Sequence, residues 1–84
     1  MSAKTLFFVQ PYVVKHHKLV ASGALTFLEA GEALQVGSEV ARRRAGVVVM
    51  AQSYDPERQA LSRPRVLHIH GRVPAGWTEE KIAA

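Results

Sequence analysis

The segment Val47–Ala51 most constrains the fold of this chain, because five apolar residues follow one another there without a polar break. Side chains alternate between the two faces of a β-strand, so such a run is typical of a central strand that is buried on both sides. The strand continues through Gln52–Tyr54 and meets Asp55–Glu57, where an aspartate and a proline predict a turn. A strand of this kind needs a neighbour at each edge and a cover over each face.

The neighbouring strands are predicted on both sides of this run. Thr5–Val14 is rich in aromatic and β-branched residues, and Pro11 within it has no N–H to donate, which indicates an edge, a bulge or a change of partner. The polar segment Lys15–Lys18 then predicts a hairpin, whose weaker returning strand begins at Leu19–Ala21 and can resume at Leu25–Phe27. The last strand is expected where polar and apolar residues alternate, Arg65–His70.

Between the two pairs of strands the apolar period becomes helical, from Glu29 to Arg44. Two starts are open: a capping box formed by Thr26 and Glu29, or a helix that begins at Glu29 after a strand. Gly46 is expected to end the helix as a left-handed cap. The small residues on the apolar stripe predict close approach to a sheet; they are Ala33, Gly37 and Ala41.

The predicted fold is α+β, with the order β-β-α-β-β, one four-stranded sheet and one helix packed on one face. Residues 1–74 form a single domain and residues 75–84 a tail, in which Thr78 can cap one frayed helical turn.

Composition excludes several classes of protein. The chain has no cysteine, which excludes disulfides, thiolate nucleophiles and cysteine-ligated zinc. No apolar run is long enough to span a membrane, and the first residues lack the pattern of a signal peptide, so we expect a cytoplasmic protein without a membrane partner.

The spacing of these elements resembles a group of small alphaproteobacterial-type proteins that have no assigned activity. The matching segments cover roughly residues 5–74 and are Phe7–Val14, Lys15–Leu19, Ala33-Leu34, Ala45–Val48, Asp55–Glu57, Val66-Leu67, Gly71 and Val73-Pro74. All of them are structural in character, so the resemblance implies a fold and no particular activity.

Catalytic patterns are missing from the sequence. There is no Gly-x-Ser-x-Gly elbow, Walker loop or dinucleotide fingerprint, so we expect neither an enzyme nor a cofactor. His68 and His70 are two apart on a strand, project to the same face, and are weak candidates for a metal site. The alternative is that both lie on the solvent face while Leu67 and Ile69 face the core.

The chain is basic, with a net charge of +4. A basic surface binds polyanions by releasing their counterions, so six arginines are candidate phosphate contacts. They are Arg42, Arg43 and Arg44 near the helix end and Arg63, Arg65 and Arg72 around the last strand. The alternative is that the charge only keeps a small protein soluble.

Two functions are therefore predicted. One helix covers only one face of the sheet, and an uncovered apolar face usually marks an interface, so the first is a small interaction module that forms a homodimer through that face. The second is a basic nucleic-acid-binding domain whose affinity is mainly electrostatic.

Overall fold

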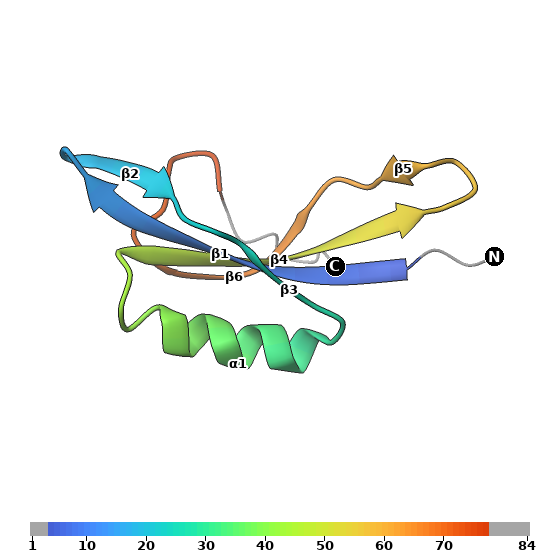
Figure 1. Ribbon diagram of the computed structural model, residues 1–84, viewed down its shortest axis with the longest axis horizontal. Helices are drawn as coiled ribbons and strands as arrows, with labels where there is room; N and C mark the ends of the chain where they lie inside the picture. Colours follow the sequence, from blue (N-terminus) through green and yellow to red (C-terminus); the bar gives the residue numbers. More distant parts are fainter. Residues whose placement is uncertain (1–3, 78–84) are drawn as a thin grey trace.

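One helix and an antiparallel sheet make up residues 4–77, the part of the chain that the computed structural model describes (Figure 1). The elements are β1 (Lys4–Lys15), β2 (Lys18–Ala21), β3 (Leu25–Phe27), α1 (Ala30–Val40), β4 (Gly46–Asp55), β5 (Ala60–Leu61) and β6 (Arg65–Gly71). The α+β class and the single helix are confirmed. The sheet has six strands where the sequence predicts four.

The extra strands arise because both outer strands are interrupted. The long strands β1 and β4 pair antiparallel at the centre, from Lys4 opposite Tyr54 to Tyr12 opposite Gly46. On the far side of β1 lie β2 and then β3, and on the far side of β4 lie β5 and β6. Each pair occupies the place of one predicted strand, so the sheet remains four strands wide.

Pro11 accounts for the first interruption. The register shifts by one residue between the pairs Tyr12–Ala21 and Val9–Leu25, so the partner of β1 changes there, as the proline predicts. Pro11 still accepts a hydrogen bond from Ser22 N at 2.9 Å, but it has no N–H to return. The side-chain amide of Gln10 replaces that donor and lies 2.6 Å from Ser22 O. A proline is thereby tolerated in a central strand.

The helix begins directly after Glu29, as the second of the two predicted starts has it, and ends four residues before Arg44. Glu29 is its N-cap without a side-chain hydrogen bond, and Thr26 lies in β3, so the capping box does not form. The helix ends at Val40, and Arg42–Arg44 follow it in a turn. Gly46 is not a left-handed cap: it is the first residue of β4 and has no positive φ.

What requires glycine at position 46 is close approach of backbone. A Cβ there would overlap the backbone of Arg72, and Gly71 opposite has a φ of +66°. The backbone of β4 therefore lies closer to the backbone at the end of β6 than a residue with a side chain at position 46 would permit.

The small residues of α1 let the helix lie close to the sheet, as predicted. Ala33 is fully buried with Val9, Val47 and Val49, and an added Cβ on Gly37 would lie 2.5 Å from a methyl group of Val49. These contacts form the core on the helix side of the sheet.

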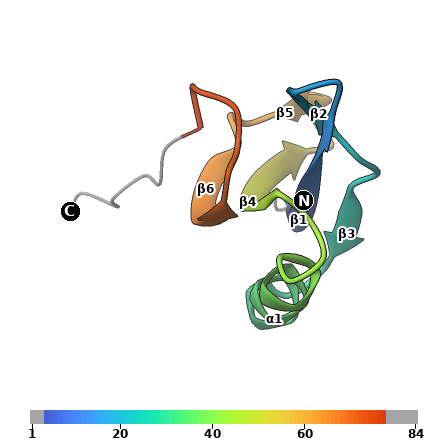
Figure 2. The same ribbon diagram turned by 90° about the vertical axis from the view of Figure 1, so that its left-hand side faces the viewer.

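The opposite face, which the sequence predicts to be uncovered, is buried as well. Val48 has no exposed surface, and Tyr12, Met50 and Val66 are each at least nine-tenths buried. Part of the cover comes from the sheet itself, which curls (Figure 2). The rest comes from partly buried side chains that pack there: Phe8, Leu19, Ile69, Val73 and Trp77.

Trp77 lies beyond the predicted domain boundary at residue 74. Its indole N–H donates a hydrogen bond to the Tyr12 hydroxyl at 2.8 Å, so the chain is anchored to the sheet at least as far as residue 77. The predicted cap at Thr78 lies outside the described residues. Within residues 4–77, no helix has the length and apolar character that a membrane span requires.

Candidate functional site

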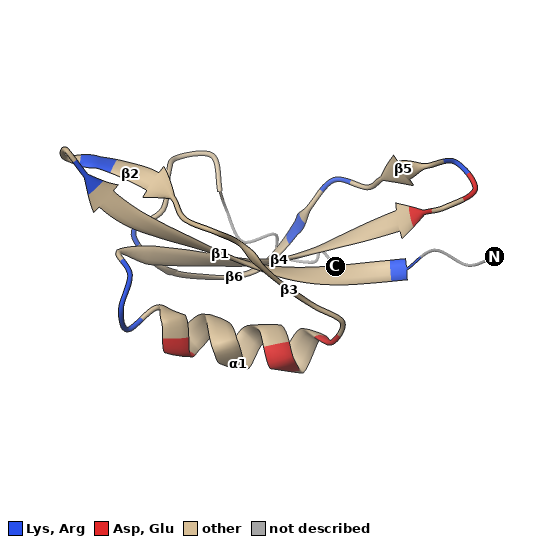
Figure 3. Cartoon of the chain, viewed as in Figure 1, with Lys and Arg blue, Asp and Glu red and all other residues tan. Residues whose placement is uncertain are grey.

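Basic side chains gather at one end of the sheet, where the β1–β2 hairpin, the α1–β4 turn and the end of β6 meet (Figure 3). We call this surface the basic end. Its cationic residues are Lys15, Lys18, Arg42, Arg43, Arg44 and Arg72, and all six are exposed. They are more than half of the ten lysines and arginines in residues 4–77.

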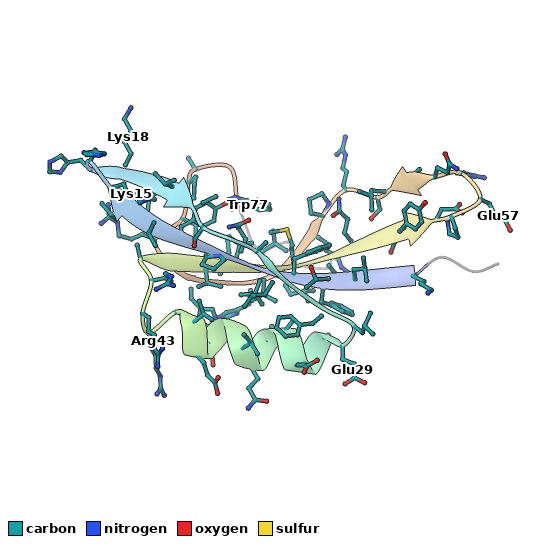
Figure 4. All side chains as sticks on the ribbon, viewed as in Figure 1. Lys15, Lys18, Glu29, Arg43, Glu57 and Trp77 are labelled. Carbon is teal, nitrogen blue, oxygen red and sulfur yellow. The ribbon has the colours of Figure 1, made fainter. Side chains whose placement is uncertain are left out.

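Backbone hydrogen bonds around Ala45 bring these segments together. Ala45 N donates to Tyr12 O at 3.0 Å, and Arg72 N donates to Ala45 O at 2.9 Å. The turn Arg42–Arg44, which we call the arginine turn, therefore lies between β1 and Arg72, the residue that follows β6. Lys15, the last residue of β1 before the hairpin tip, lies three residues beyond Tyr12, about 10 Å along the strand. Figure 4 shows Lys15, Lys18 and Arg43 at this same end, with Lys18 and Arg43 pointing away from the sheet on opposite sides of it.

The hairpin tip has an unusual backbone. Lys15 and Lys18 are paired across it, and the two-residue turn between them is His16-His17 with φ angles of 51° and 66°. Both angles are positive, as a type I′ turn requires, although neither residue is glycine or asparagine. The sequence predicts the hairpin correctly, but without a turn signal of the usual kind.

Little negative charge opposes the basic end. Glu39, in the last turn of α1, is the nearest carboxylate along the chain, and with Val40 and Arg43 it lines a shallow hollow of about 210 Å³. Between residues that the structure describes, the one salt bridge joins Arg58 to Asp55 in the β4–β5 turn. That turn is far from the basic end, and within residues 4–77 none of the six cations takes part in a salt bridge.

The six arginines predicted as phosphate contacts do not lie together. Arg42, Arg43, Arg44 and Arg72 belong to the basic end, whereas Arg63 and Arg65 line a separate cavity with Thr5, Ala51 and Ser53. Lys15 and Lys18 are not among the phosphate contacts that the sequence predicts. The signal that could have included them is their place on either side of a predicted hairpin tip.

His68 and His70 share a face of β6, as their spacing predicts, with ring centroids 4.2 Å apart. Their side chains lie over the helix side of the sheet, since His68 pairs with Val49 and His70 with Val47, yet His68 is exposed and His70 is partly buried. A bulge near Leu67 changes the alternation: Leu67 packs on the helix side and Ile69 on the opposite one. In residues 4–77 no cluster of three or more potential metal ligands occurs.

Comparison with known proteins adds no assignment. No protein-family model matches the chain, and neither a curated protein nor a solved structure matches it. The resemblance to small alphaproteobacterial-type proteins therefore stays a prediction.

Proposed function

We propose that this protein binds nucleic acid electrostatically through its basic end. The observation that carries the proposal is that six exposed cations from three separate segments lie at one end of the sheet. Contacts of this kind neutralise phosphates and release condensed counterions, which supplies affinity without reading the sequence.

The hairpin tip supports this proposal in two ways. Lys15 and Lys18 stand directly opposite one another, and like charges in that arrangement repel. An anion that binds between or beside them relieves the repulsion. In addition, a two-stranded β-ribbon fits the major groove of B-DNA, so the tip can approach a duplex while Arg42–Arg44 contact the flanking phosphates.

The test is a titration of the full chain against mixed-sequence duplex DNA and RNA, at about 50 and 200 mM salt, with strands that end in hydroxyl groups. Four to six phosphate contacts predict that the affinity falls roughly 10²–10³-fold between these salt concentrations. Replacing Arg42 and Arg43 by glutamine lowers the slope of log K against log salt by about 1.8.

The matched control is the double variant Lys4→Gln with Arg58→Gln, which removes the same charge from the other end of the molecule. The proposal requires that this control bind nearly as tightly as the parent chain. Equal losses in the two double variants would mean that net charge alone attracts nucleic acid. Absence of binding at the lower salt concentration would exclude the function.

Self-association stays a second prediction, and the structure changes the surface on which it depends. Val48 and Met50, on the face expected to form a homodimer, are already buried within one chain. The large apolar side chains that remain exposed are spread over several elements instead: Val14, Val20, Leu25, Leu28, Leu34 and Leu61.

A further inference from the structure

A cavity of about 240 Å³ lies away from the basic end, where β4 is flanked by the first residues of β1 and β6. We call it the arginine cavity. It is lined by Thr5, Ala51, Ser53, Ser62, Arg63 and Arg65. All but Ala51 carry side chains that donate hydrogen bonds, two of them are cations, and none is a carboxylate.

The strand register explains why these side chains surround a hollow. Thr5 pairs with Ser53, and Ala51 pairs with Arg65, so the four residues share one face of the sheet. Ala51 contributes only a methyl group and is buried as the floor. The larger side chains of the neighbouring residues form the sides of the cavity.

Hydrogen bonds of Ser62 fix the position of the segment between β5 and β6, which forms one side of the cavity. The Ser62 hydroxyl accepts a hydrogen bond from Ser53 N at 2.9 Å and donates one to Arg63 O at 3.1 Å, while Ser62 N donates to Ser53 O at 2.8 Å. Pro64 fixes the backbone between the two arginines. The arginine backbones are thereby positioned without use of either guanidinium group.

Both guanidinium groups remain available to a ligand. Neither donates a hydrogen bond to another described residue, and each has five N–H donors. Thr5 and Ser53 share one hydrogen bond of 3.3 Å between their hydroxyl groups, which leaves one hydroxyl hydrogen free to turn into the cavity. The ligand must therefore be rich in acceptors and anionic.

We propose that the arginine cavity binds a phosphomonoester. Two arginines match the charge of its dianion, and the guanidinium fork suits phosphate oxygens, which accept paired hydrogen bonds. The volume is below that of a typical site for a drug-sized ligand, so only the phosphoryl group and a small substituent enter. That group is either a free small phosphate ester or the terminal phosphate of a nucleic-acid strand.

The test follows the backbone amide signals of the full chain by NMR during titration with inorganic phosphate, with chloride at equal ionic strength as reference. The proposal requires saturable shifts at Ser53, Ser62, Arg63 and Arg65, with a Kd on the order of 1 mM. Replacing Arg63 and Arg65 by glutamine weakens this binding at least about tenfold, since each lost contact is charge-assisted.

The variant Arg42→Gln with Arg43→Gln is the matched control, because it removes the same charge at the basic end and leaves the cavity intact. A second variant, Thr5→Val with Ser53→Ala, removes the two hydroxyls and keeps both arginines; it weakens binding about threefold. Shifts that do not saturate, or equal losses in both arginine variants, would overturn the proposal.

Two further titrations distinguish the sources of the phosphoryl group. Glycerol phosphate represents a free ester, and a short oligonucleotide with or without a 5′-phosphate represents a strand end. Shifts at the arginine cavity that need the 5′-phosphate assign it to strand ends, and shifts with glycerol phosphate alone assign it to free esters. Either result supports the site, and neither depends on the basic end.

Discussion

At the scale of single residues, His16 and His17 occupy backbone conformations that favour other side chains. Positive φ angles cost a non-glycine residue roughly 1–3 kcal/mol each, and asparagine and glycine tolerate them best. Replacing His16 by Asn and His17 by Gly is therefore expected to raise stability by about 1–2 kcal/mol. Thermal unfolding followed by circular dichroism checks this, as a rise of roughly 4–8 °C per kcal/mol.

The variant His16→Ala with His17→Ala is the control for that change, because it removes both imidazoles and keeps the unfavourable angles. It should unfold near the temperature of the parent chain. A parent chain that is as stable as the Asn-Gly variant would show that the histidines themselves stabilise the turn.

Gln10 is the second residue whose role is visible only in the structure. Its amide donates to Ser22 O at 2.6 Å and to Pro11 O at 2.9 Å in a partly buried position. Replacing Gln10 by Ala leaves a carbonyl without a donor and is expected to cost about 1–2 kcal/mol in urea unfolding. Gln52→Ala removes a similar bond, to Ser62 O, at an exposed site, and should cost under about 0.5 kcal/mol. Equal costs would contradict the role given to Gln10.

At the scale of elements, the sequence predicts the order of strands and helix because periodicity depends on neighbouring residues. Val47–Ala51 is fully or almost fully buried, and Asp55 accepts hydrogen bonds from the N–H groups of Glu57 and Arg58, as expected of a turn. The division of the outer strands is not predictable in this way. It depends on how Gln10 replaces the donor that Pro11 lacks, and that contact spans twelve residues.

The helix end shows a similar limit. A glycine after a helical pattern predicts a left-handed cap, but Gly46 is needed because β6 returns against it from 26 residues further along the chain, at Arg72. Local sequence cannot distinguish these two uses of glycine. The same return brings Arg72 to the arginine turn, so the basic end depends on it.

One added methyl group at position 46 is expected to have a large effect on stability. Gly46→Ala places Cβ against the backbone of Arg72, which cannot move without breaking the strand pair, so we expect a loss of about 3 kcal/mol or more in urea unfolding. Gly31→Ala, in open space on α1, should instead stabilise the protein by about 0.5–1 kcal/mol through helix propensity. A Gly46→Ala protein as stable as the parent chain would disprove the close approach.

At the scale of the whole molecule, the sequence predicts the net charge of the protein but not where the charged side chains lie on its surface. Composition gives a basic protein, yet the arginines separate into the basic end and the arginine cavity because β6 spans the distance between Arg65 and Arg72. A seven-residue strand is about 23 Å long, so residues close in sequence come to lie at opposite ends of β6.

The sequence also does not predict that the sheet face opposite the helix is covered, because part of that cover is Trp77. This residue follows the predicted domain, and its contact with Tyr12 joins positions 65 residues apart. A sheet with one helix was expected to expose an apolar face, and the chain instead returns across it. Whether the protein self-associates therefore depends on how firmly this segment is held.

Trp77→Ala is accordingly expected to lower stability by about 2–3 kcal/mol and to increase dimer formation, since it exposes Tyr12 and its apolar neighbours. Tyr12→Phe is the matched control: it removes the same hydrogen bond, keeps the face covered, and should cost about 1 kcal/mol without changing association. Sedimentation velocity at micromolar concentrations measures the dimer fraction. Quenching of the single tryptophan by acrylamide checks that its indole is shielded in the parent chain. If Trp77→Ala leaves the dimer fraction unchanged or lowers it, the covered face is not a latent interface, and self-association must use Leu25, Leu28 or another exposed apolar side chain.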